Sequence, residues 1–276
     1  MPALATFFCG FTASFLWFKG GNICQQPEIP ATAAVNVNTI SSSDGLGCTV
    51  APDMQLRMLA VGDSITVGWG GSEYWNSYRK DLKSYLDLDC PMKNRTYIGS
   101  VHTGNFANNN HEGYPGYDIN QIAHNTQPML ETSLLELPNV VLLHAGTNDL
   151  GELHSLPYEE APDRLGQLMD TILETVPNVT LIVAKIVYSA EPRTDRGPRV
   201  DLFNAALPGI VEERVAKGFK IQLADLSSIG KAAVDMSDGL HPSDVGYRRM
   251  AIRWFEAMQN VTRAGLITPA LDVAVK

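Results

Sequence analysis

Residues 56–68 of the chain read LRMLAVGDSITVG, an apolar run that ends at Gly62 and is followed at once by Asp63 and Ser64. A short run that is apolar on both faces is typical of a strand buried in a parallel sheet. Ser64 then has two interpretations: it is a nucleophile carried at the end of a strand, or its hydroxyl caps the first turn of a helix. The rest of the chain has to decide between them.

Four further apolar runs alternate with longer segments of helical periodicity. Strand, helix and strand in succession predict right-handed crossovers and an α/β fold, a three-layer α/β/α sandwich around a parallel sheet. In such sheets ligands bind outside the carboxyl ends of the strands. The further strands are expected at residues 95–100, 139–146, 179–187 and 220–226, and the clearest helical stripes at 165–176 and 247–258.

Small and polar residues cluster in four segments near the ends of the expected strands. These are GDS at 62–64, HEGYPGYDI at 111–119, GTND at 146–149 and DGLHPSDVGY at 238–247. Each segment alone also reads as an ordinary turn or helix cap. Because the four converge on one edge of the sheet, we expect them to form a single site.

The residue types in these segments suit nucleophilic catalysis by Ser64. A serine hydroxyl needs a base to take its proton during attack, and the neutral imidazole of His241 suits that role. Asp238 precedes His241 by three residues, so in a tight turn its carboxylate can hold the imidazole Nδ1–H. The backbone N–H groups of Ser64 and Gly116 and the carboxamide of Asn148 are candidate donors to an oxyanion.

Several neighbouring residues compete with this assignment. Gly113 is the alternative oxyanion donor, and we favour Gly116 because it lies just before an expected helix and has no Cβ to block a close approach. His111 and His144 are interpreted as packed or hydrogen-bonding histidines rather than as second bases.

The segment GWGGSE at 68–73 is rich in glycine, but it lacks the third glycine of a dinucleotide fingerprint. We therefore reject nucleotide binding there. Trp69 and Trp75 have two interpretations: they line a wall that faces a sugar near the site, or they pack between helices.

The four segments, in this order, resemble the SGNH hydrolases, the GDSL-type esterases. The resemblance implies Ser64 as the nucleophile, Gly116 and Asn148 as oxyanion donors, and Asp238 with His241 as the rest of the triad. It also implies a flavodoxin-like sheet of five parallel strands. The longer strings GDSITVG, HEGYPGY and DGLHPSDVGY look most like carbohydrate esterase family 3, whose characterised members remove acetyl groups from xylan.

The expected function is that of a serine esterase, a carboxylic ester hydrolase that removes O-acetyl groups from acetylated xylan through an acyl-enzyme and needs no cofactor. Two alternatives stay open. One is a GDSL-type lipase or lysophospholipase that acts on longer acyl esters, and the other is a non-catalytic carbohydrate-binding module of the same fold. The net charge of -9 argues against a nucleic-acid partner, and no stable membrane insertion is expected.

The chain is expected to contain more than its catalytic domain, which we place at residues 55–265. Residues 1–18 are apolar, and residues 1–22 are interpreted as a signal peptide, although they lack a basic start and a clear cleavage site; a mis-assigned start is the alternative. The polar, aperiodic residues 23–54 are expected to form a flexible leader or linker, and residues 266–276 a tail.

Sequons and cysteines favour a secreted glycoprotein. Once the signal is removed, Cys24, Cys48 and Cys90 remain, which allows one disulfide whose partners cannot be read from the sequence. None of the cysteines has the close Cys or His spacing of a zinc site, so no metal is expected. The sequons begin at Asn94, Asn178 and Asn260.

Overall fold

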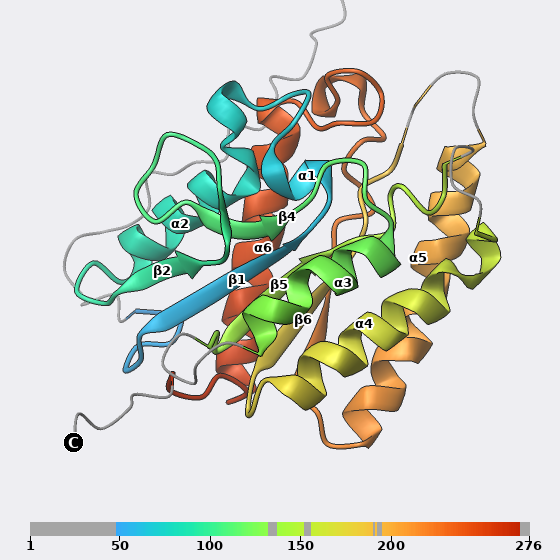
Figure 1. Cartoon of the computed structure of the whole chain (residues 1–276). Helices are drawn as coiled ribbons and strands as arrows, with labels where there is room; N and C mark the ends of the chain where they lie inside the picture. The colour runs from blue at the N-terminus through green and yellow to red at the C-terminus, as the bar shows by residue number, and fades with distance from the viewer. Residues whose placement is uncertain (1–47, 132–136, 152–155, 190, 192–194, 271–276) are drawn as a thin grey trace, which may run out of the picture. The chain divides into compact units, whose positions relative to one another are not determined.

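The computed structural model of the chain has one compact unit at residues 46–276, in which helices and strands alternate (Figure 1). The expected signal peptide and most of the expected leader lie outside the described residues. The residues that the structure describes are 48–131, 137–151, 156–189, 191 and 195–270.

A mostly parallel sheet of seven strands lies at the centre of this unit, in the order β3-β4-β1-β5-β6-β7, with β2 also paired to β1. β1 pairs with β5 on one side and with β2 and β4 on the other. The strands are β1 (Leu56–Gly62), β2 (Arg95–Ile98), β3 (Val101–His102), β4 (Asn110–Gly113), β5 (Val140–His144), β6 (Thr180–Lys185) and β7 (Ile221–Asp225).

The three-layer α/β architecture is confirmed, but the sheet differs from the five parallel strands that the resemblance implied. Two strands share the place beside β1 on the side away from β5. β2 pairs with the first half of β1, and β4 pairs with Val61 and Gly62 at its end. β3 runs antiparallel to β4. The sequence pattern missed β4 because its buried residues include His111 and Glu112, whose side chains bind Thr103 and Ser100 instead of adding apolar periodicity.

Helices cover both faces of the sheet (Figure 1). Met58 and Ala60 pack in the cluster formed with α2 and α6, whereas Leu59 and Val61 pack in the cluster formed with α3, α4 and α5. Both predicted helical stripes, in α4 and α6, contribute to these clusters as expected. The helices are α1 (Ser64–Val67), α2 (Ser77–Asp89), α3 (Ile119–Leu130), α4 (Ala161–Thr175), α5 (Arg196–Ala216) and α6 (Asp244–Arg263), with short 3-10 turns η1 (Glu73–Trp75), η2 (Tyr158–Glu160) and η3 (Ala233–Asp235).

The segment just before β1 is part of the folded core. Val50 and Ala51 are buried against it, and a disulfide joins Cys48 to Cys90 at the end of α2. The expectation of a flexible leader is therefore wrong for residues 48–54, because a covalent bond and apolar burial hold them.

Two other expectations concern the tail and the metal-ligating groups. In the expected tail, Ile267 is buried as well, so packing continues past residue 265. Within the described residues, one close group of ligating side chains was found, Cys48, Asp89 and Cys90, and its two sulfurs are already joined to each other.

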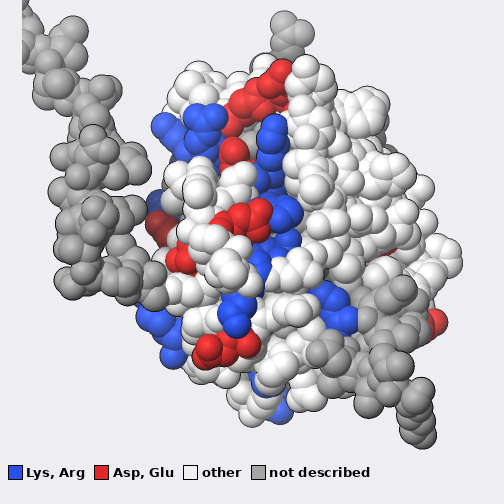
Figure 2. All heavy atoms as spheres, turned by 90° about the vertical axis from the view of Figure 1, so that its left-hand side faces the viewer, with Lys and Arg blue, Asp and Glu red and all other residues white. Residues whose placement is uncertain are grey.

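The surface over α2 and α6 carries both signs of charge. Figure 2 shows Lys and Arg side chains beside Asp and Glu side chains on one face of the molecule. Two of the ion pairs there join Lys83 to Asp87 and Arg253 to Glu256, each at 2.8 Å. Among the described residues, every helix is too short or too polar to cross a bilayer.

Trp254 provides a test of how α6 holds the sheet. Its side chain is fully buried, with its ring centroid 5.6 Å from that of Tyr78. Trp254→Ala is expected to lower the free energy of unfolding by about 3–5 kcal/mol, because it removes contacts and leaves a cavity. Ile252→Ala, at an exposed position of the same helix, is the matched control and is expected to change it by about 0.5 kcal/mol or less. Urea denaturation gives both values, and equal effects would contradict this packing.

Candidate active site

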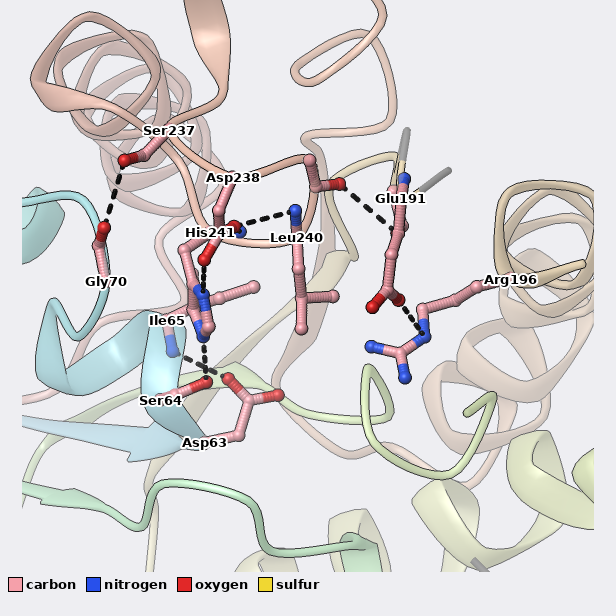
Figure 3. A network of polar contacts seen from close by, with 12 residues as sticks. Asp63, Ser64, Ile65, Gly70, Glu191, Arg196, Ser237, Asp238, Leu240 and His241 are labelled. Atoms are coloured by element: carbon pink, nitrogen blue, oxygen red, sulfur yellow. Dashed lines mark hydrogen bonds and ion pairs between the residues drawn. The ribbon is translucent and has the colours of Figure 1, made fainter. Parts of the chain in front are cut away.

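Ser64 is the first residue of α1, directly after β1. The cap of this helix is Asp63, whose Oδ1 accepts a hydrogen bond from the Ile65 N–H at 2.9 Å. The interpretation of Ser64 as the N-cap is therefore wrong, since its neighbour fills that position. The Ser64 hydroxyl instead lies 3.0 Å from Nε2 of His241 (Figure 3).

His241 and Asp238 lie in the loop before α6 and are bound to each other. The imidazole Nδ1 is 2.8 Å from Asp238 Oδ2, and Oδ1 of the same carboxylate accepts from the backbone N–H groups of Leu240 and His241. Partial burial alone would raise the pKa of Asp238, but these hydrogen bonds, led by the one from the His241 side chain, lower it.

An ionised Asp238 determines which nitrogen of His241 carries the proton. A carboxylate without a proton can only accept a hydrogen bond, so the imidazole must place its N–H on Nδ1. Nε2 then has a free lone pair directed at the Ser64 hydroxyl, 3.0 Å away. This is the arrangement in which an imidazole can take a proton from serine during nucleophilic attack.

Gly116 lies in a tight turn between β4 and α3. The Tyr117 N–H donates to the Tyr114 carbonyl across this turn, which has Pro115 at its second position and Gly116, with a φ of +80°, at its third. That geometry is a type II turn, whose third residue must adopt a positive φ and is therefore usually glycine. A Cβ at Gly116 would meet no atom within 4 Å, so the backbone is open on that side.

Asn148 follows β5 and reaches across to the same turn. Its Nδ2 donates a hydrogen bond to the Tyr117 carbonyl at 2.9 Å. Because a carboxamide nitrogen has two N–H groups, this contact fixes the side chain and leaves a second donor. Asn148 and the Gly116 turn are therefore held together, as the predicted site requires.

Gly113, the competing donor, is already engaged. Its N–H donates to Nδ1 of His111 at 2.9 Å, while the other ring nitrogen of His111 lies 2.9 Å from Thr103 Oγ1. Since Nδ1 accepts, His111 is neutral with its proton on Nε2. Burial, with a smaller contribution from the positive charge of Arg79, lowers the pKa of His111 to about 2.

His144, the other histidine near the site, is also a structural residue. It is fully buried at the end of β5, and its Nε2 accepts a hydrogen bond from the Val187 N–H at 3.4 Å. Burial lowers its pKa. The interpretation of His111 and His144 as packed, hydrogen-bonding histidines agrees with these contacts.

A buried ion pair that the sequence analysis did not single out holds the loop after β5. Asp149 accepts hydrogen bonds from Nε of Arg164 in α4 and from the Ile119 N–H at the start of α3, each at 3.0 Å. Burial raises the pKa of Asp149 in spite of these donors. In the sequence Asp149 reads as a cap, and it does bind a helix N-terminus, but the helix is α3 rather than the one that follows it.

Comparison with known proteins agrees with this geometry. Residues 60–249 match the GDSL-like lipase/acylhydrolase family, and the chain belongs to that family. Esterases are among the proteins that it resembles. A multidomain esterase of Ruminococcus flavefaciens is 24% identical over 264 residues, which cover 89% of this chain and 34% of that protein. The chain spans between about a third and three fifths of the curated relatives it matches.

Solved structures share the fold over most of the described unit. A Clostridium thermocellum family 3 carbohydrate esterase is 34% identical, superposes with a TM-score of 0.63, and the match covers 77% of this chain and 99% of that one. A family 3 carbohydrate esterase of Talaromyces cellulolyticus, 21% identical, superposes with a TM-score of 0.58 over 76% of this chain and 99% of its own. The former is a close structural match, and the latter shows the shared fold.

The neutral state of His111 leads to a prediction about stability and pH. Its pKa is 6.5 in an exposed setting and about 2 in the fold, so the unfolded chain binds the proton first. Stability is then fully present above pH 6.5 and is lost as the pH falls through that value toward 2. Between pH 7 and pH 5 the free energy of unfolding is expected to fall by about 2 kcal/mol more in the wild type than in His111→Asn.

Urea denaturation at both pH values measures this difference. Asparagine is chosen because its Oδ1 can still accept the Gly113 N–H, while the variant has no imidazole to titrate. Equal losses in the two proteins would mean that His111 takes up its proton without unfolding.

Proposed function

We propose that the protein hydrolyses O-acetyl esters on a polysaccharide, acetylated xylan, through an acyl-enzyme on Ser64. The observation that carries this proposal is the hydrogen-bonded series from Asp238 through His241 to the Ser64 hydroxyl (Figure 3). A serine, an imidazole and a carboxylate in this order are the parts of a serine esterase.

In the first half of the reaction, Ser64 Oγ attacks the acetyl carbonyl carbon while His241 Nε2 takes the hydroxyl proton. The imidazolium then gives that proton to the sugar oxygen as the ester bond breaks, which leaves an acetyl group on Ser64. Asp238 stabilises the imidazolium through the 2.8 Å contact with Nδ1.

The carbonyl oxygen becomes negative in the tetrahedral intermediate and needs donors. Ser64 supplies its N–H, which as part of the first helical turn has no partner within the helix. Gly116 supplies a second N–H from its turn, and Asn148 a third donor from the carboxamide fixed on Tyr117. Donors that are held in place before the reaction stabilise the oxyanion at no reorganisation cost.

The second half returns the enzyme to its starting state. Water attacks the acetyl-Ser64 carbonyl, and His241 takes a proton from the water and then gives it back to Ser64 Oγ as acetate leaves. The same oxyanion donors serve both steps, so the chemistry of these residues is complete without a cofactor.

Three further observations support a carbohydrate substrate outside the cell. The 34% identity to a family 3 carbohydrate esterase favours an ester on a sugar over a lipid. The Cys48–Cys90 disulfide is typical of an oxidising compartment, which favours a secreted protein. The asparagines of the three sequons are exposed, which leaves them accessible to glycosylation.

The test of the proposal is acetate release from acetylated xylan by the wild type and by Ser64→Ala, with a long-chain para-nitrophenyl ester assayed beside it. The wild type is expected to release acetate and to prefer the polysaccharide, and the variant to release none, because it has no nucleophile. Preference for the long chain would support a lipase. Binding of xylan without any release would support a carbohydrate-binding module.

Asn148→Ala tests the oxyanion assignment. The variant is expected to lose about 100- to 1000-fold in kcat on a short ester, because one donor to the oxyanion is removed. Asn120→Ala is the control, since Asn120 is an exposed asparagine in the neighbouring helix α3, and its kcat is expected to stay at the wild-type value. An unchanged kcat in Asn148→Ala, measured with para-nitrophenyl acetate, would exclude Asn148 from the oxyanion site.

A further inference from the structure

Three large aromatic side chains lie exposed on the segment between α1 and α2. Trp69, Tyr74 and Trp75 are 46%, 63% and 45% exposed. The two tryptophan rings have centroids 5.1 Å apart and an angle of 35° between their planes. Scattered exposed apolar residues are ordinary, but a group of aromatic rings on one short segment marks a surface that binds something.

The backbone of this segment adopts a strained conformation. Tyr74, Trp75 and Ser77 have φ values of +53°, +58° and +51°. Bulky residues rarely adopt this left-handed region, and such strain persists only where the surrounding structure holds it. Strain of this kind is concentrated at functional sites.

Arg79 is the group that holds the segment. It is fully buried and donates hydrogen bonds to the carbonyls of Trp75 at 3.2 Å, Thr66 at 3.0 Å, Thr103 at 3.1 Å and Asn109 at 2.6 Å. Burial lowers its pKa to about 10, so it stays charged at neutral pH. Within the described residues no carboxylate forms an ion pair with it, so its charge is satisfied by the carbonyls of these loops.

The same segment lies against His241. A Cβ on Gly70 would come within 2.6 Å of the His241 Nδ1 atom, and Ser237 Oγ donates to the Gly70 carbonyl at 3.0 Å (Figure 3). Trp69 donates its N–H to the Ser64 carbonyl, also at 3.0 Å. The segment that carries the aromatic rings therefore contacts the serine through Trp69 and the histidine through Gly70.

The chemistry of the proposed reaction gives the two sides of the site different roles. His241 must lie beside the oxygen of the leaving alcohol, because it protonates that oxygen. Gly116 and Asn148 lie on the loops that face the carbonyl oxygen of the acyl group. Since the aromatic segment packs on His241, its rings adjoin the alcohol side, where an acetylated polysaccharide carries its sugar.

We propose that Trp69, Tyr74 and Trp75 form an aromatic platform on which a pyranose ring of the substrate stacks. A pyranose has an apolar face of C–H bonds that packs against aromatic rings, while its hydroxyl groups stay in water. This inference rests on the proposed function and deepens it, since it names the residues that select a sugar chain as the leaving group. A long acyl chain is the competing occupant, and it would enter from the other side.

The test compares kinetics on three substrates: an acetylated xylo-oligosaccharide, para-nitrophenyl acetate and para-nitrophenyl octanoate. In Trp69→Ala and in Trp75→Ala, the ratio of kcat/KM for the oligosaccharide to kcat/KM for para-nitrophenyl acetate is expected to fall by about tenfold or more, mainly through KM. Trp69→Phe, which keeps a ring, is expected to recover part of this ratio. Leu88→Ala is the control, because Leu88 is 79% exposed at the far end of α2, and it is expected to keep the wild-type ratio.

The possible outcomes distinguish a failure of the aromatic platform from a failure of the proposed function. An unchanged ratio in both tryptophan variants would overturn the platform while leaving the proposed function in place. A selective loss of octanoate hydrolysis would assign the rings to an acyl chain and overturn it as well. If the wild type releases no acetate from the oligosaccharide, the proposed function itself fails.

Binding without turnover gives a second readout. Ser64→Ala cannot form the acyl-enzyme, so its affinity for the acetylated oligosaccharide reports on contacts alone. Titration followed by tryptophan fluorescence is expected to shift the emission of the exposed rings in Ser64→Ala and to show affinity weakened by about tenfold or more when Trp75→Ala is added. Equal affinities with and without Trp75 would contradict the platform.

Discussion

The architecture of the site depends on close packing at Gly62, the last residue of β1. A Cβ at this position would lie 2.2 Å from the His144 carbonyl oxygen and 2.4 Å from Thr66 Oγ1, so only glycine fits. Gly62 is paired with Gly113 of β4 on one side and with His144 of β5 on the other. The loops that follow β1, β4 and β5 therefore begin side by side at the same edge of the sheet. Residues near the start of each loop can then contact one another.

Buried polar groups then hold these loops in place. Arg79 binds carbonyls before, within and after the aromatic segment. Asp149 joins the loop after β5 to two helices, and His111 accepts a hydrogen bond from the Gly113 N–H. Such groups are costly to bury unless every donor and acceptor finds a partner. The loops thus gain a single defined arrangement, which is what an oxyanion site needs.

The apolar periodicity of the sequence predicted the elements that pack through apolar side chains. These are β1, β5, β6, β7 and the stripes of α4 and α6. The periodicity could not reveal β4, whose side chains are polar and yet buried, or Arg79, which looks like any surface arginine in a helix sequence. The three-residue spacing of Asp238 and His241 predicted a local contact, and that contact exists. The pairing of Cys48 with Cys90 spans 42 residues and depends on the fold, so no local pattern contains it.

The contact between Asp238 and His241 lies within one tight loop, whereas 177 residues separate His241 from Ser64. The short loop thus sets the internal geometry of the Asp238–His241 pair, while the position of the pair depends on long-range contacts with Ser64 and with the Gly70 carbonyl. Segments between Ser64 and Asp238 that do not touch this loop can lengthen, shorten or change sequence without disturbing the pair. On the proposed function, the loops that stand clear of the pair can therefore diverge toward different esters while the Asp238–His241 pair stays the same.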